Sequence, residues 1–316
     1  MPVSRISAGM AAAALLTVMV SAMPAEAAGE TTPINPLRLG EKIPDEAYGA
    51  YQRGLYKTAL SLALEHAKTG NAAIAPRAAE ILSRGLGVPQ DLPQAAKLYS
   101  QAAEKGVLEA QFQTALFLLM GQYLPKDEAK AKAYLEKAVA GGHALAGFNL
   151  GQLVLSKATN DVERKKAYDL FLAAANVGLA DAQYAVSQFL ANGTGGVPYD
   201  EAAARVWLEK AARQNYDTAM LDYASWLIDG IGGKKDYAAG FAWMKRAAES
   251  GNVAAQRQLA RLYENGIGTK GDTVTAAAWY IIAKRAKLHD PKLDDLLDGL
   301  TDEEMKNAIE LANRLK

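Results

Sequence analysis

Apolar and small residues recur along this chain with a helical period, and the same arrangement returns at a fixed interval. The stretches WLEKAARQN, WMKRAAESG and WYIIAKRAK begin at Trp207, Trp243 and Trp279, an interval of 36 residues (207 to 243 and 243 to 279). Mostly small residues follow each tryptophan by four and five positions, so neighbouring helices can approach while the large ring fills the space between them. We therefore predict that the three tryptophans are buried structural residues of a repeated helix.

Each repeat is predicted to end at a residue that readily adopts a left-handed backbone. Glycine and asparagine do so most easily, and they often terminate helices for this reason. These residues are Gly70, Gly106, Gly142, Gly178, Asn215 and Gly251. A small or apolar residue four positions later opens the next helix. The repeat therefore consists of a first helix (helix A), a loop, a second helix (helix B) and a stop.

The loops between helix A and helix B are rich in glycine and close with an aspartate. They read RGLGVPQD from Arg84, NGTGGVPYD from Asn192, DGIGGKKD from Asp229 and NGIGTKGD from Asn265. The glycines permit a sharp turn, and the aspartate is predicted to cap the following helix. Phosphate binding is a weaker alternative, because no strand precedes the loops and the nucleotide-binding spacings are absent. Two loops depart from the pattern: MGQYLPKD from Met120 keeps one glycine, and SKATND from Ser156 has none.

Three longer stretches are similar to a known repeat. They are ALAGFNLGQLVL, FLANGTGGVPYDEAAARVWLEKAA and AAQRQLARLYENGIGTKGDTVTAAAWY. They resemble the Sel-one-like repeat family, the 36-residue relatives of tetratricopeptide repeats, and the units that open at Ala182, Ala219 and Ala255 match its pattern best. The resemblance spans residues 47 to 289. It implies an all-α fold, a right-handed α-solenoid of about seven helix-turn-helix repeats with a C-terminal capping helix.

Both ends of the chain differ from the repeats. A basic start, an apolar stretch and the small residues before Ala28 predict a secretory signal peptide over residues 1–27, followed by an extended leader over 28–44. An uncleaved membrane anchor is the alternative, but the apolar run is shorter than the ~20 residues that span a bilayer. We expect a periplasmic or secreted protein without stable membrane insertion.

The repeats are predicted to occupy residues 45–289, and two capping helices residues 290–316. Asp290 suits an N-cap before Pro291, and Thr301 with Glu304 suits a capping box. Because the last repeat of a solenoid leaves an apolar face open, these helices are expected to cover it.

Composition narrows the functional classes. Lys+Arg and Asp+Glu both number 35, so no net charge attracts nucleic acid, and the chain has no cysteine for thiolate chemistry or disulfides. The three histidines, His66, His143 and His289, lie far apart in an array whose repeats contact only their neighbours, so they are expected on the surface or at helix ends. We predict no enzymatic activity, no metal site and no cofactor.

The candidate partner-binding face is the side of helix A opposite its packing stripe, which lines the concave surface in the family that the chain resembles. Apolar and aromatic residues stand there where contact with water alone would favour polar ones, and amides accompany them. The candidates are Phe112, Leu116, Met120, Phe148, Gln152, Tyr184, Gln188, Leu221 and Arg257. The alternative is that curvature of the array or the leader buries this stripe.

The resemblance implies a non-catalytic periplasmic scaffold or regulator that binds a protein segment, with a glycan strand as the less favoured ligand. The partner would be a sensor domain or an envelope complex, since the family includes periplasmic negative regulators of exopolysaccharide two-component signalling. Hydrolysis of the cell wall or of β-lactams is the alternative function, taken from cysteine-rich members of the family. The absence of cysteine here weakens that comparison.

Overall fold

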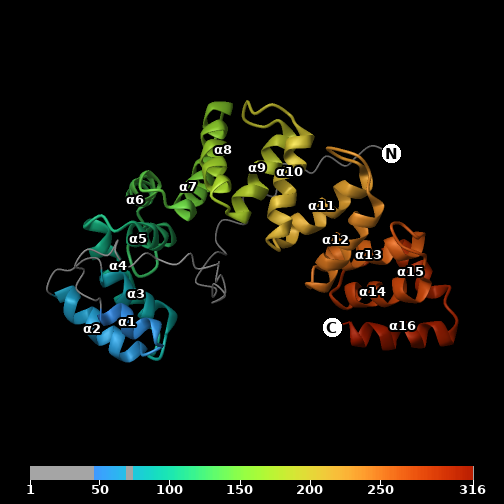
Figure 1. Cartoon of the computed structure of the whole chain (residues 1–316), viewed down its shortest axis with the longest axis horizontal. Coiled ribbons are helices and arrows are strands. Elements are labelled where there is room, and N and C mark those ends of the chain that lie inside the picture. Colours follow the sequence, from blue (N-terminus) through green and yellow to red (C-terminus); the bar gives the residue numbers. More distant parts are fainter. Residues whose placement is uncertain (1–45, 69–73, 316) are drawn as a thin grey trace, which may run out of the picture. The chain divides into compact units, whose positions relative to one another are not determined.

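The computed structural model describes residues 46–68 and 74–315, and every regular element in those two ranges is a helix. This confirms the all-α prediction, and the succession of helical hairpins is that of an α-solenoid (Figure 1). The predicted signal peptide, the leader and the stop at Gly70 lie outside the described residues. Within the described ranges, no helix combines the length and the apolar character needed to cross a membrane.

The chain divides into two compact units, residues 1–156 and 157–316. The helices that begin in the first unit are α1 (Glu46–Gln52), α2 (Tyr56–Lys68), α3 (Ala75–Arg84), α4 (Leu92–Glu104), α5 (Leu108–Met120), α6 (Glu128–Ala140) and α7 (Ala144–Lys157). The helices of the second unit are α8 (Asp161–Asn176), α9 (Ala180–Asn192), α10 (Glu201–Arg213), α11 (Asp217–Asp229), α12 (Tyr237–Glu249), α13 (Val253–Asn265), α14 (Thr273–Arg285), α15 (Pro291–Asp298) and α16 (Asp302–Arg314). The boundary falls next to the loop that has no glycine.

Helix B begins with a side-chain cap in every repeat from α4 to α14. The cap is an aspartate or asparagine whose side-chain oxygen accepts a hydrogen bond from a backbone N–H in the first turn. The capping residues are Asp91, Asp127, Asn160, Asp200, Asp236 and Asp272. The predicted role of the loop aspartates is therefore confirmed, and the two atypical loops also keep a cap.

The predicted stop residues adopt the left-handed backbone. The φ angle is 86° at Gly106 and Gly142, 98° at Gly178 and Gly251, and 63° at Asn215. A Cβ atom at any of the four glycines would meet nothing within 4 Å, so the constraint is conformational and not steric. Lys287 takes the same place after the last repeat, with φ 66°. The sequence analysis missed that residue because lysine has no preference for this conformation.

The loop glycines have a second role that the sequence did not reveal. In the second unit, one glycine of each loop lies directly against helix B of the preceding repeat. A Cβ atom at Gly232 would be 2.3 Å from the carbonyl oxygen of Glu201, and one at Gly268 would be 2.1 Å from that of Tyr237. These glycines therefore permit both the turn and the close approach of two repeats.

The three equivalent tryptophans differ in their burial. Trp279 is 2% exposed in the core of the second unit, as predicted. Trp207 and Trp243 are only half-buried, and the prediction of burial is wrong for them. Their open ring faces are covered by cations of the same helix, with Lys210 Nζ 3.7 Å from the Trp207 ring centroid and Arg246 Cζ 5.1 Å from that of Trp243.

The last two helices pack against α14. Leu293 of α15 and Ala308 of α16 are fully buried in the core that contains Trp279. The predicted capping box is confirmed, because the Thr301 hydroxyl accepts from Glu304 N–H and the Glu304 carboxylate accepts from Thr301 N–H.

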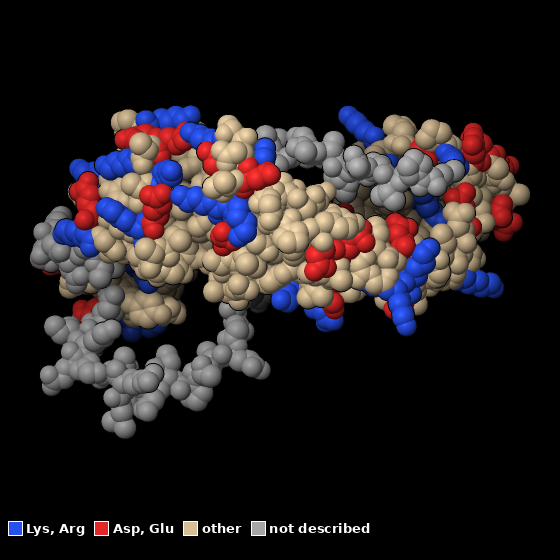
Figure 2. All heavy atoms as spheres, turned by 90° about the horizontal axis from the view of Figure 1, so that it is seen from above, with Lys and Arg blue, Asp and Glu red and all other residues tan. Residues whose placement is uncertain are grey.

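Charged side chains of both signs are mixed on the face of the molecule that Figure 2 presents. Within the described residues, several ion pairs join side chains that lie one turn apart on a single helix. These pairs are Arg84 with Glu80, Lys165 with Asp169, Arg213 with Glu209 and Lys245 with Glu249. These four carboxylates are thus neutralised locally.

Candidate functional site

The predicted partner-binding stripe is not uniformly exposed. Phe112 is 6% exposed and Phe148 is 9% exposed, whereas Tyr184, Leu221 and Arg257 are half-buried. The expectation of a continuous exposed apolar stripe is therefore wrong at the two phenylalanines. The stripe is also divided between the two compact units, because Phe112 and Phe148 belong to the first and the other three residues to the second.

The turn of the following repeat contacts two rings of this stripe, and at Phe112 this contact accounts for the burial. The residue that precedes the opening alanine of helix A by three positions lies over the aromatic ring of the repeat before it. The ring of His143 is 4.7 Å from that of Phe112, and the ring of Tyr216 is 5.2 Å from that of Tyr184. A repeat considered alone shows an open face here, whereas stacked repeats cover it.

The remaining predicted residues lie on helix A of their repeats and are partly exposed. Leu116 and Met120 are on α5, Gln152 is on α7 and Gln188 is on α9. Gln188 lies one turn beyond Tyr184 on the same side of α9.

His143 serves the start of α7. Its Nδ1 accepts from Ala146 N–H at 3.1 Å, and its Nε2 lies 2.9 Å from Glu109 Oε2. These contacts fit a neutral ring that donates from Nε2, and the hydrogen bond from His143 lowers the pKa of the Glu109 carboxyl. The histidine is therefore a helix-end residue, as the sequence predicted.

In the second unit, two tyrosines and three aspartates gather on the helix A face of α9 and α11. We call Asp181, Tyr184, Tyr216, Asp217 and Asp222 the Tyr184 patch. The Tyr184 hydroxyl donates to Asp222 Oδ2 at 3.0 Å. Burial raises the pKa of Asp222 and of Asp181, and the negative charges of Asp181 and Asp217 add to the effect of burial in raising that of the Tyr216 phenol. The site thus holds acidic groups in partly desolvated surroundings.

Sequence analysis found only Tyr184 of this patch. Asp181 and Tyr216 precede the opening alanines of their helices, and Asp222 lies three positions after Ala219. These residues could have been predicted by comparing each helix A with the turn of the next repeat. In stacked repeats, that turn lies beside helix A of the repeat before it.

Arg257 has a partner within the chain. The Asp290 carboxylate is 3% exposed, with Arg261 Nη2 2.6 Å and Arg257 Nε 4.0 Å from its Oδ2. Burial opposes ionisation of Asp290, but the two arginines outweigh it and lower the pKa of the carboxyl. The charge of Arg257 therefore stabilises the C-terminal helices, in addition to any part it takes in binding.

Asp290→Asn is expected to lower the free energy of unfolding of the second unit by about 1–3 kcal/mol at neutral pH. Because the folded-state pKa is lowered, the charge stabilises the fold above the ordinary aspartate pKa, and this stabilisation is lost as the pH falls through the lowered value. Denaturant titrations at several pH values measure the difference. All four tryptophans lie in the second unit and report its unfolding. A difference that persists unchanged in acid would contradict this account.

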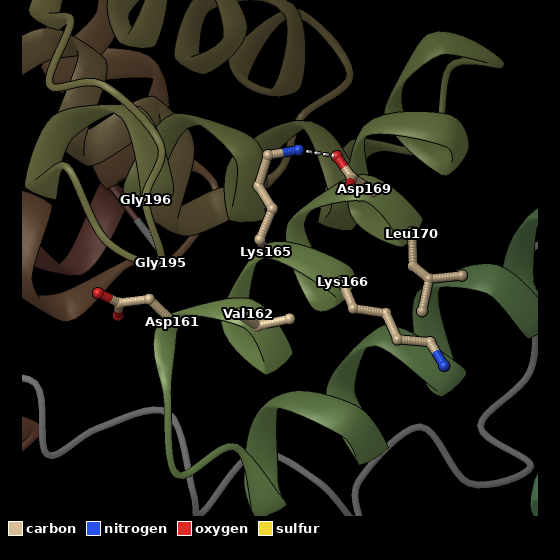
Figure 3. Close-up of a pocket in the computed structure, with 8 residues that line it drawn as sticks. All are labelled: Asp161, Val162, Lys165, Lys166, Asp169, Leu170, Gly195 and Gly196. Carbon is tan, nitrogen blue, oxygen red and sulfur yellow. Dashed lines mark hydrogen bonds and ion pairs between the residues drawn. The ribbon is translucent and has the colours of Figure 1, made fainter.

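A shallow pocket lies on α8 beneath the loop that follows α9 (Figure 3). Its lining residues are Asp161, Val162, Lys165, Lys166, Asp169, Leu170, Gly195 and Gly196. Lys165 is paired with Asp169, while Lys166 points away from that pair. Among the described residues that line this hollow, none carries an aromatic ring or a hydroxyl group. The Tyr184 patch, with its converging rings and acids, is therefore the better candidate for recognition.

The chain has recognisable relatives. The Sel1 repeat profile matches residues 77–107, 108–143, 180–216, 218–252 and 253–287. Over 173 residues, 53% of this chain, the sequence is 29% identical to chitin synthase regulatory factor 3 of Schizosaccharomyces pombe. A protective antigen of uropathogenic Escherichia coli that displays an SLR fold has a TM-score of 0.73 and 25% identity over 85% of this chain. A Sel1 repeat protein from Oxalobacter formigenes has a TM-score of 0.66 and 24% identity over 79% of this chain and 100% of its own.

The chain spans only part of two of these relatives, 19% of the length of the fission yeast protein and 60% of the Escherichia coli structure. The profile matches also leave a gap between residues 143 and 180. That gap contains α7, α8, the loop without glycine and the boundary between the compact units. The repeat pattern is therefore weakest where the chain divides.

Proposed function

Because this chain belongs to the Sel1 repeat family, whose repeats generally mediate protein–protein interaction, we propose that it is a non-catalytic scaffold or regulator of the cell envelope that binds a segment of a partner protein. The binding residues would lie on the helix A face of the second unit, on α9 and α11. The proposal places the chain in the periplasm or outside the cell, after removal of residues 1–27.

One observation carries the proposal, namely that the Asp222 carboxylate lies half-buried on the helix A face and that no cation of residues 46–68 and 74–315 forms an ion pair with it. The helix B rings of the same unit, Trp207 and Trp243, are covered by the chain's own cations. A half-buried acid beside aromatic rings destabilises the free protein, whereas a bound partner can compensate its charge. A bound partner would therefore stabilise the helix A face more than the helix B face.

The finer role that we propose is regulation of an envelope signalling protein, with a sensor domain or an envelope complex as the partner. This role rests on the sequence resemblance to periplasmic negative regulators of exopolysaccharide signalling and on the expected signal peptide. An extended segment of such a partner would suit a helix face that carries rings and acids.

Crosslinking in living cells tests the proposal. A photoreactive amino acid at Gln188 on α9, one turn from Tyr184, is expected to capture a single envelope protein in high yield. The matched control carries the same amino acid at Val206 on α10, which is 52% exposed on helix B. In the crosslinked product, the chain that carries the photoreactive amino acid should begin at Ala28, and the product should be recovered from the envelope fraction.

Equal capture from Gln188 and Val206 would contradict a binding face on helix A, and absence of capture from Gln188 would contradict partner binding there. Recovery of the protein from the cytoplasm with residues 1–27 still attached would contradict the envelope location but would leave partner binding untouched. The two parts of the proposal therefore fail separately.

A further inference from the structure

The Tyr184 patch combines two aromatic rings with three carboxylates. The ring centroids of Tyr184 and Tyr216 are 5.2 Å apart at an interplanar angle of 31°. A cation within about 6 Å of either ring centroid would be attracted to that ring. The Tyr184 hydroxyl, 3.0 Å from Asp222 Oδ2, connects the rings to the acid.

The three carboxylates have no cationic partner in the described part of the chain. None of the ion pairs found there involves Asp181, Asp217 or Asp222. Asp217 accepts a hydrogen bond from the neutral amide of Asn252 at 2.9 Å, and Asp222 accepts from a neutral hydroxyl. Neither contact offsets the negative charge.

The first unit contains a similar group of tyrosines and a carboxylate in which an arginine of the chain is already bound. Arg77 Cζ lies 5.1 Å from the ring centroid of Tyr48 and 4.5 Å from that of Tyr51. Its Nη1 donates to Glu80 Oε2 at 2.9 Å, and the Tyr51 hydroxyl donates to Glu80 Oε1 at 2.8 Å. Two tyrosines, a carboxylate and a hydroxyl-to-carboxylate hydrogen bond thus surround a guanidinium group. The Tyr184 patch likewise has two tyrosines and a hydroxyl-to-carboxylate hydrogen bond, but no cation of the described residues is found over its rings.

We propose that the Tyr184 patch binds the guanidinium group of an arginine in a segment of the partner protein. This inference rests on the proposed function and assigns the chemistry that its helix A face recognises. Arginine fits better than lysine, because its planar group stacks on an aromatic ring while its N–H groups donate to a carboxylate. The partly buried Leu221, which adjoins Asp222 in sequence and packs against the core, offers apolar contact for the residues beside that arginine.

Fluorine NMR of the full chain labelled with 3-fluorotyrosine tests the inference. The probe is N-acetyl-arginine methylamide, added up to about 50 mM because a ligand of this size binds weakly. Two of the 14 tyrosine signals, assigned by Tyr184→Phe and Tyr216→Phe, should shift in a saturable way. The neutral analogue N-acetyl-citrulline methylamide should leave both signals in place. An equal response to citrulline, or no response to arginine, would overturn the proposal.

Asp222→Asn is expected to weaken binding of the arginine probe by at least about tenfold. Because burial raises the pKa of Asp222, its charge opposes folding at neutral pH, and the variant should unfold at the same or a higher temperature. The matched control is Asp229→Asn, which removes an exposed carboxylate from the same helix and should leave binding unchanged. If both variants lost the same amount of probe binding, the effect would come from the net charge of the protein and not from the Tyr184 patch, and the proposed site would be overturned.

Three further outcomes separate the possible occupants of the patch and the two proposals. Arg38 is the one arginine in the sequence of the predicted leader, residues 28–44. Tighter binding of the probe to Arg38→Ala would show that the chain fills the patch with this arginine, and it would overturn the assignment to a partner. Crosslinking from Gln188 without any response to the arginine probe would leave the proposed function standing and remove this inference. A response to the probe without crosslinking would keep the arginine site and remove the proposed partner.

Discussion

Gly268→Ala is expected to lower the free energy of unfolding of the second unit by about 2–5 kcal/mol. Two costs add at this position. The backbone has φ 71°, which an L-residue adopts at a cost of roughly 1–2 kcal/mol, and the new Cβ would lie 2.1 Å from the carbonyl oxygen of Tyr237 and 2.7 Å from Phe241 Cβ. Relief of that clash requires the loop and α12 to separate, at a further cost of about 1–3 kcal/mol. Denaturant titration followed by tryptophan fluorescence measures the change.

Gly196→Ala is the matched control for this prediction. Gly196 has φ 70°, almost the value at Gly268, but a Cβ atom there would meet nothing within 4 Å. The control therefore carries the conformational cost alone, roughly 1–2 kcal/mol. Equal destabilisation by the two substitutions would mean that the contact between loop and preceding helix B does not limit the approach of the repeats.

Trp279→Ala is expected to destabilise the second unit by about 3–5 kcal/mol. The indole is 2% exposed, and its removal would leave a large cavity between α14 and the core that includes Leu259 and Leu293. The measurement is again the denaturant midpoint, read from the remaining tryptophans and from far-ultraviolet circular dichroism.

Trp207→Ala should cost only about 1–2 kcal/mol, although it is the same change at the equivalent place in an earlier repeat. Its ring is half-buried, and Lys210 Nζ lies 3.7 Å from the ring centroid. If Trp207→Ala and Trp279→Ala lowered the free energy of unfolding equally, the difference in burial would not explain how much each tryptophan contributes to stability.

The backbone of the repeats was predictable because it depends on the residue at each position. Gly178 and Asn215 end their helices in the left-handed conformation that these two residue types readily adopt, and Asp200 caps α10 through its own side chain. Such features are local, so a repeated pattern of residue types predicts them without knowledge of the neighbours.

The exposure of the candidate site was not predictable in the same way. Phe112 is covered by His143, and Tyr184 reaches Asp222 across 38 residues, so each contact depends on a residue from the next repeat. The tryptophan column shows the same limit. Trp207 and Trp279 occupy equivalent positions, but only Trp279 lies on a helix against which α16 packs.

The C-terminal helices make the integrity of the second unit depend on residues outside the repeats. The buried Tyr280 accepts a hydrogen bond from Asp290 N–H at 2.9 Å and donates to the Asp294 carboxylate at 2.7 Å. Leu293 and Ala308 then complete the core around it. A chain that stopped before Pro291 would leave apolar surface of α14 open to water and to proteases. Truncation before Pro291 is therefore expected to make the second unit more sensitive to proteolysis than the chain that keeps these helices.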